Sequence, residues 1–317
     1  MSILSRPYFH DEAAAFQFLE GLLWASGPVC PKCGTVGEAG KLEGVKSKAS
    51  AKNPEGVTRQ GLWKCYACRQ QFTVRVGTVF ESAHIPLHKM LQAVYLLSSS
   101  KKGISAHQIH RALEITYKSA WFLCHRIREA MREGKVPPMG GEGKTVEIDE
   151  TYIGGRDKNK HAHKRPRVGR GGITKEIAFS LVERGGKVRS HHVANVSGKT
   201  LRPILAEQLD AASYVMSDTG GARLAKDYAK HGMVNHGIGE YVRGEVSTNT
   251  VEGYFSILKR GINGVYHHVS PQHLKRYLTE FDFRYNERAA LGVEDAERAS
   301  KALKGIVGKR LTYKKPY

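Results

Sequence analysis

Two C-x-x-C pairs are the feature that most restricts the fold of this chain. Cys30 and Cys33 form the first pair, and Cys65 and Cys68 form the second. Each pair can present two thiolates on one tight turn, and two such turns supply the four sulfur ligands of a tetrahedral structural Zn²⁺ site. A redox role is the alternative for one C-x-x-C pair, but it does not explain why there are two. We therefore expect a zinc ribbon over residues 27–82, held together by the metal because so small a module buries little core.

The charge balance predicts the kind of partner. Lys and Arg total 50 and Asp and Glu total 30, which gives a formal net charge of +20. An excess of this size favours a polyanionic partner, and nucleic acid above others, because Lys and Arg contacts to phosphate dominate that affinity. The alternative is that the charge only aids solubility. The sequence has no apolar run of about 18 residues and no apolar leader, so we expect a cytoplasmic, nucleoid-associated protein that binds no membrane.

Residues 83–134 have a helical pattern in which two helices meet at a tight turn near Glu114–Thr116. Thr116 is a suitable N-cap for the second helix. The lengths and the turn fit a helix-turn-helix as well as an ordinary pair of antiparallel helices. The basic charge and the neighbouring cysteine pairs favour the DNA-binding alternative. The side chains then expected to reach phosphate or base edges are Arg111, Lys118 and Arg126.

Two acids occur near the ends of short β-type runs. In "VEIDET", strand alternation puts Glu147 and Asp149 on the face opposite to Val146 and Ile148, and in "YVMSDTGG" Asp218 precedes a Gly-Gly turn. Carboxylates from two strands and a helix can converge and hold two Mg²⁺ ions, an arrangement suited to phosphodiester cleavage and transfer. The structural alternative is that Asp149 is a hydrogen-bond acceptor at a strand end and Asp218 an Asx-turn residue.

The stretch "STNTVEGYFSILKRG", residues 247–261, predicts an amphipathic helix. Glu252 and Lys259 are two turns apart, so both side chains lie along one line on the flank of the apolar stripe. The carboxylate could bind a metal while the lysine meets a phosphate. The alternative is a capping function, with Asn249 as the N-cap and Glu252 as the third helical residue. Taken alone, this stretch favours the cap.

Shorter patterns predict other elements. Residues 8–24 are typical of an amphipathic helix, and the alternation from Phe72 to Val76 predicts a strand. The basic run at 156–172 is typical of a loop, and residues 222–230 are typical of a helix.

Several stretches together resemble the DDE transposases of bacterial insertion sequences, in the zinc-ribbon-headed group often called ISXO-two-like. The resemblance runs from about Cys30 to Arg288 and rests on "CPKC", "CYACRQQFTVRVGTVFESAHIPLHKM", "VEIDETYIGG", "SDTGGA" and the long run from "STNTVEGYFSILKRG" to "FDFRYNER". It implies a ribonuclease-H-like catalytic fold and Mg²⁺-dependent strand transfer of DNA ends.

Carried over by position, the resemblance implies that Asp149 and Asp218 are the first two catalytic acids. It implies that Glu252 is the third, with Lys259 seven residues later. Some members of the group have Asn as the third residue, a part that Asn249 could play. Because an amide binds Mg²⁺ more weakly than a carboxylate does, we expect Glu252. Further DNA contacts are expected from Lys259, Arg260, His267 and His268.

These observations predict a multidomain α+β chain. The expected parts are an N-terminal helix (1–26), the zinc ribbon (27–82), a helix-turn-helix module (83–134), a linker (135–144), a ribonuclease-H-like catalytic domain (145–290) and a basic C-terminal tail (291–317). The expected function is a transposase that binds terminal inverted repeats as a homodimer or larger assembly. The alternatives are a domesticated zinc-ribbon regulator whose active site is not in use, and a nuclease that cuts without joining.

Overall fold

The computed structural model describes residues 2–51, 53–155, 161, 175–221, 224, 228 and 230–312. The chain divides into two compact units. The ribbon unit consists of Met1–Ser100, Ile104–Met131 and Glu294–Tyr317, and the sheet unit consists of Lys101–Gly103 and Arg132–Val293. The loop predicted at 156–172 and the helix predicted at 222–230 lie mostly outside the described residues.

The ribbon unit begins with helix α1 and a small antiparallel sheet. Their bounds are Glu12–Leu23 for α1, Ala39–Leu42 for β1, Leu62–Cys65 for β2 and Gln71–Phe72 for β3, with β2 in the middle of the sheet. Helix α1 starts later than predicted because the carboxylate of Asp11 accepts the amide of Ala14 at 2.7 Å and caps it. The strand predicted through Val76 was wrong beyond Phe72. The chain turns there, and the amide of Val76 donates to the carbonyl of Thr73 at 3.0 Å.

Three helices follow in the same unit: α2 (Leu87–Ser99), α3 (Ala106–Leu113) and α4 (Tyr117–Ala130). Glu114, between α3 and α4, has a left-handed φ of 50°. The side chain of Thr116 accepts the amide of Ser119 at 3.2 Å. The predicted turn and cap are therefore confirmed. No helix in the described part of the chain has both the length and the apolar character needed to cross a membrane.

The C-terminal segment differs from the predicted tail. Residues 295–304 form helix α9 (Asp295–Lys304), which contacts α2 within the ribbon unit. Ala299, Ala302 and Leu303 are buried, and their spacing places them on one face of the helix. The guanidinium of Arg298 donates to the carbonyl of Ser98 at 3.2 Å. A stripe of small apolar residues thus folds part of a segment whose composition is basic.

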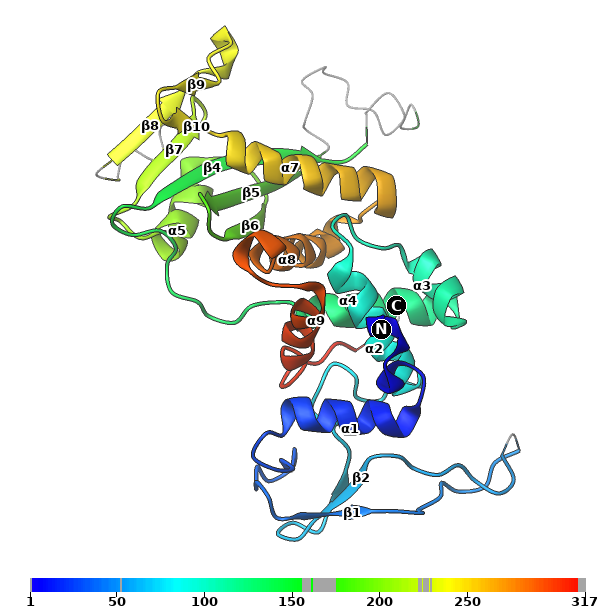
Figure 1. Ribbon diagram of the computed structural model, residues 1–317. Helices are drawn as coiled ribbons and strands as arrows, with labels where there is room; N and C mark the ends of the chain where they lie inside the picture. Colours follow the sequence, from blue (N-terminus) through cyan, green and yellow to red (C-terminus); the bar gives the residue numbers. More distant parts are fainter. Residues whose placement is uncertain are drawn as a thin grey trace. The chain divides into compact units, whose positions relative to one another are not determined.

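The sheet unit is built on a five-stranded mixed sheet with the order β6-β5-β4-β7-β8 (Figure 1). The strands are β4 (Thr145–Ile153), β5 (Glu176–Glu183), β6 (Val188–Val193), β7 (Tyr214–Asp218) and β8 (Lys230–Val234). Strands β4, β5 and β6 pair antiparallel, whereas β7 runs parallel to both β4 and β8. A separate hairpin of β9 (Val242–Arg243) and β10 (Val246–Ser247) leads into α7.

Helices cover both faces of this sheet. On one face, Val146 and Ile148 pack with α5 (Gly198–Gln208). On the other face, Ala178 and Val182 pack with α7 (Asn249–Gly261) and α8 (Pro271–Asn286). A π-helical turn, Ile262–Tyr266, extends the end of α7. Because the face of β4 that carries Glu147 and Asp149 lies under α7, it is not a solvent face, and this sets the geometry of the acids.

Candidate active site and metal sites

The four cysteines of the two C-x-x-C pairs come together in the ribbon unit. Their Sγ atoms all lie within 4.8 Å of one another. The pairs Cys30–Cys68 and Cys33–Cys65 are each separated by 3.6 Å. Four thiolates about 2.3 Å from one Zn²⁺ ion in a tetrahedron lie about 3.8 Å apart, so the cluster fits this metal. Hydrogen bonds with Thr35 lower the pKa of the Cys33 thiol to about 6, whereas burial and the neighbouring thiols raise the pKa of Cys68 to about 12.

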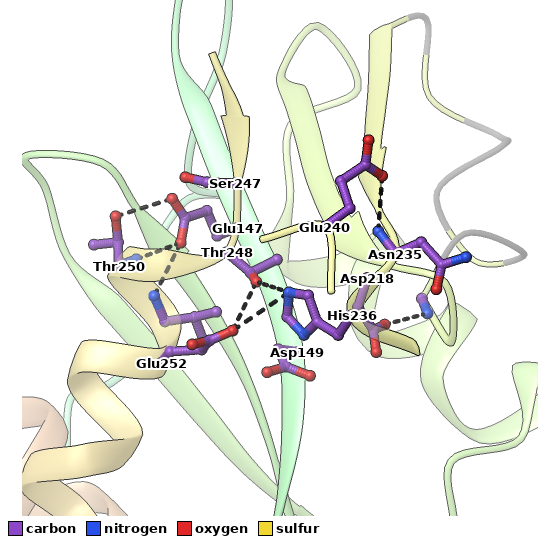
Figure 2. A network of polar contacts seen from close by, with 12 residues as sticks. Glu147, Asp149, Asp218, Asn235, His236, Glu240, Ser247, Thr248, Thr250 and Glu252 are labelled. Carbon is purple, nitrogen blue, oxygen red and sulfur yellow. Dashed lines mark hydrogen bonds and ion pairs between the residues drawn. The ribbon is translucent and has the colours of Figure 1, made fainter. Parts of the chain in front are cut away.

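Three predicted acids lie in the sheet unit, on three different elements. Asp149 lies on β4, Asp218 ends β7, and Glu252 lies in the first turn of α7. In the view of Figure 2, Glu252 and Asp218 lie on opposite sides of His236, and Asp149 lies below it. Burial raises the pKa of Asp149 to about 7, and Glu150, Asp218 and Glu252 add to that rise. The charges of the other two carboxylates therefore act on Asp149.

The acids present the donor type that Mg²⁺ prefers, since every ligand atom they offer is a carboxylate oxygen. Among the described residues, only the cysteines form a group compact enough to hold an ion as it stands. The oxygen Oδ1 of Asp218 also accepts the amide of Gly221 at 2.9 Å, three residues on, whereas the Asx turn of the structural alternative would bond the residue two on. The donor set therefore fits Mg²⁺ by its chemistry, while the three carboxylates do not form a compact ligand group.

A cavity of about 950 Å³ within the sheet unit is lined by two of these acids, Asp149 and Glu252. Its charged lining residues are the acids Asp149, Glu150 and Glu252 and the cations Lys102, Lys259 and Arg260. The guanidinium of Arg260 donates to the hydroxyl of Ser256 at 2.6 Å. Asn263, Gly264 and Val265 of the π-helical turn complete part of the wall. A cavity lined by both acids and cations suits a substrate that carries phosphate and needs a metal.

The start of α7 distinguishes the two candidates for the third catalytic residue. The hydroxyl of Thr248 donates to Oε1 of Glu252 at 3.1 Å, and Nε2 of His236 lies 3.5 Å from the same oxygen (Figure 2). Asn249 is exposed and is the first helical residue, with Thr248 as the N-cap. The alternative in which Asn249 caps this helix was therefore wrong. The geometry favours Glu252.

The cap of α7 comes from Glu147, a residue that sequence reasoning missed. Its carboxylate accepts the amides of Thr250 and Val251 at 2.8 and 3.0 Å and the hydroxyl of Thr250 at 2.9 Å. Arg184 donates to it at 2.6 Å. Alternation did put Glu147 on the same face as Asp149, but nothing in the sequence indicated that a helix covers that face.

Two further lining residues, Lys102 and Glu150, were also missed. Glu150 alternates away from Asp149, so the strand pattern gave no reason to select it. Lys102 lies far from the acids in sequence. Its neighbour Gly103 has a φ of +95°, and a Cβ there would lie 2.0 Å from the hydroxyl of Tyr266. This glycine is therefore required for the close packing of Lys101–Gly103 near the end of α7.

The predicted DNA contacts divide into exposed and buried side chains. Arg111 and Lys118 are exposed in the ribbon unit, and His267 and His268 are exposed in the sheet unit. Arg126 is only 8% exposed, and its guanidinium donates to the carbonyl of Glu81 at 3.0 Å. Burial lowers the pKa of Arg126. The structure contradicts the predicted contact of Arg126 with DNA, because helical periodicity gave its position on α4 but not what packs against that face.

Comparison with known proteins gives two family models and one relative. Residues 10–71 match the transposase zinc-ribbon domain, which includes all four cysteines. Residues 140–286 match the ISXO2-like transposase domain, which includes the three acids. A protein of Halobacterium salinarum (strain ATCC 700922 / JCM 11081 / NRC-1), described as "Uncharacterized protein in transposable element ISH50", is 29% identical over 296 residues. The match covers 87% of this chain and 91% of that protein.

Proposed function

We propose that this chain, which carries a transposase zinc-ribbon domain and an ISXO2-like transposase domain, is the DNA transposase of an insertion sequence. Its ribbon unit would bind the terminal inverted repeats, and its sheet unit would cut the DNA ends and join them to a target. The observation that carries the proposal is a single cavity lined both by the carboxylates of Asp149 and Glu252 and by three cations. That combination supplies metal ligands and phosphate contacts in one place.

The chemistry follows from the ligands. Asp149, Asp218 and Glu252 would hold two Mg²⁺ ions. Lys259 and Lys102, which line the cavity, would contact the phosphate of the bound DNA. Bound Mg²⁺ lowers the pKa of an attacking water or 3′-hydroxyl and stabilises the leaving oxygen. Water breaks one phosphodiester and leaves a 3′-hydroxyl at the element's end. That hydroxyl then attacks a target phosphodiester, so one such bond replaces another and no ATP is required.

The proposal includes a ribonuclease-H-like fold for the sheet unit. The mixed five-stranded sheet supports it, since β4 is central and helices cover both faces. The acids lie on β4, on the neighbouring β7 and on α7, so the centre of the sheet brings together residues from distant parts of the chain.

The proposal also includes a helix-turn-helix role for α3 and α4. The short connection and the exposed basic side chains of Arg111 and Lys118 support it. Joining two DNA ends in one event requires at least two active sites or two bound ends, so we propose a homodimer or larger assembly that acts on DNA in the cytoplasm.

The decisive test is strand transfer with Asp149→Asn. The wild-type chain should join a repeat-ended duplex to a plasmid in Mg²⁺, and Asp149→Asn should abolish joining while repeat binding stays unchanged. Glu207→Gln, an exposed acid of the same unit, is the matched control and should retain joining. Strand transfer by Asp149→Asn at the wild-type rate would show that Asp149 is not part of the catalytic site.

The same assay separates the alternatives. Cut ends without joined products from the wild-type chain would indicate a nuclease, and repeat binding with neither product would indicate a regulator. Short inverted repeats just outside the reading frame, flanked by a duplicated target, would support a mobile element independently of the assay.

A further inference from the structure

We infer that Glu147 is a positioning residue, which caps α7 in place of Thr248 and so leaves the Thr248 hydroxyl to hold the carboxylate of Glu252. The inference rests on the proposed function, because it assigns Glu252 as a metal ligand. It adds two residues, Glu147 and Thr248, whose contacts with the start of α7 and with Glu252 neither strand nor helix periodicity predicts.

Thr248 occupies the N-cap position but does not perform the usual task of an N-cap side chain. A capping threonine accepts the backbone amide of the second or third helical residue. In α7 those residues are Thr250 and Val251, and both of their amides donate to the carboxylate of Glu147. The side chain of Thr248 makes no capping hydrogen bond. Another element therefore supplies the cap.

The Thr248 hydroxyl instead faces the candidate metal site. It donates to Oε1 of Glu252 at 3.1 Å and lies 3.3 Å from Nε2 of His236 (Figure 2). Thr248 is fully buried, whereas the side chain of Glu252 is 42% exposed. A fully buried hydroxyl thus hydrogen-bonds a carboxylate that is open to solvent. Such partners of a ligand fix its direction and raise its affinity for metal.

Glu147 can perform this task because Arg184 neutralises it. The carboxylate is fully buried, and a buried charge is costly unless it is paired and hydrogen-bonded. Arg184 donates to it at 2.6 Å and also to the carbonyls of Glu245 and Ser247, at 2.8 and 3.1 Å. One ion pair therefore joins β4, the hairpin before α7 and the first turn of α7.

This arrangement links the first acid to the third. Glu147 and Asp149 are two residues apart on the same face of β4. Glu147 accepts the amides at the start of α7. The strand that carries Asp149 therefore also fixes the start of the helix that carries Glu252. The anionic cap also suits the positive end of the helix dipole.

The test compares Thr248→Val, which keeps the side-chain shape without the hydroxyl, with Thr248→Ser, which restores the hydroxyl. Melting temperature reports capping, and Mn²⁺ binding followed by electron paramagnetic resonance reports the metal site without DNA. Thr248→Val should keep the wild-type melting temperature and weaken Mn²⁺ binding about 10-fold or more. Thr248→Ser should restore binding. In strand transfer, Thr248→Val should lower kcat and leave KM for DNA unchanged.

Glu147→Gln provides the converse. It should lower the melting temperature and weaken Mn²⁺ binding, because the amide cannot replace the ion pair with Arg184.

The inference fails if Thr248→Val has a lower melting temperature than the wild type, as loss of a true cap would require. It also fails if Thr248→Val binds Mn²⁺ as tightly as the wild type. A wild-type chain that binds Mn²⁺ but joins no DNA would contradict the proposed function. It would still support the inference if Thr248→Val binds Mn²⁺ more weakly at an unchanged melting temperature. A wild-type chain that binds no Mn²⁺ would defeat both.

Discussion

The imidazole Nε2 of His236 lies 3.5 Å from Oε1 of Glu252, which also accepts the hydroxyl of Thr248. Glu252 thus meets two polar partners while it lines the cavity. Asn249, three residues earlier, is exposed and is not among the residues that line this cavity. The two candidates for the third catalytic residue therefore have different surroundings, and this difference can be measured.

Glu252→Gln should lower Mg²⁺-dependent strand transfer by more than about 100-fold, because loss of a ligand should cost at least as much as loss of a partner that only orients one. Asn249→Ala should stay within a few-fold of the wild type, since Asn249 does not line the cavity. Initial rates of joining at saturating DNA measure both. The opposite ranking, with Asn249→Ala inactive and Glu252→Gln active, would mean that the amide is the third ligand.

Much of this site could be predicted from local patterns. The spacing of Cys30, Cys33, Cys65 and Cys68 is sufficient, because two tight turns determine a four-sulfur cluster whatever fold surrounds them. Asp149 was found because its strand alternates. The resemblance to transposases supplied the pairing of Asp149 with Asp218 and Glu252, which no local pattern contains.

The rest depends on tertiary packing. Glu147 was assigned to a polar face, but α7 covers that face and turns the carboxylate into a cap. Arg126 has the spacing of an exposed side chain on α4, yet it packs near Glu81 and is buried. The face of a strand or helix can be inferred from periodicity. What lies against that face is decided by residues far away in sequence.

Zinc should hold the ribbon together. The apolar cluster around the cysteines is small, with Cys30, Cys65 and Phe72 as its buried members. Cys65→Ser should therefore lose the metal and the sheet of β1, β2 and β3, and metal analysis should find about one zinc per wild-type chain. Cys124→Ala is the matched control, since Cys124 is buried in α4 and lies outside the four-sulfur cluster. Zinc retained by Cys65→Ser, or lost by Cys124→Ala, would contradict the four-cysteine site.

DNA binding should distinguish an exposed cation of α4 from a buried one. Lys118 is exposed in the first turn of α4, so Lys118→Ala should weaken repeat binding and reduce the slope of log K against log[salt] by about 0.9, the value for one phosphate contact. Arg126→Ala should leave that slope unchanged and lower the melting temperature, because Arg126 donates to the carbonyl of Glu81. Fluorescence anisotropy over a salt series measures the slope. A reduced slope with Arg126→Ala alone would reverse these assignments.

Stability should fall as the pH rises, because of a buried acid under α7. The carboxylate of Asp282 accepts the hydroxyl of Tyr254 at 2.6 Å and both the hydroxyl and the amide of Ser190. Burial outweighs these hydrogen bonds and raises the pKa of Asp282 from 3.8 to about 7. Between these values the folded chain holds a proton that the unfolded chain has released. This contribution to stability is therefore complete below about pH 4 and is lost as the pH rises to about 7.

A change in pKa from 3.8 to about 7 corresponds to on the order of 4 kcal/mol in the free energy of unfolding. Asp282→Asn keeps a neutral side chain at every pH, so its unfolding free energy should vary less than that of the wild type between pH 4.5 and pH 8, by up to that amount. Urea denaturation without Mg²⁺ across this range measures the difference. Asp210→Asn, an exposed acid of the same unit, should follow the wild-type curve. Parallel curves for Asp282→Asn and the wild type would show that Asp282 is ionised in the folded chain throughout this range.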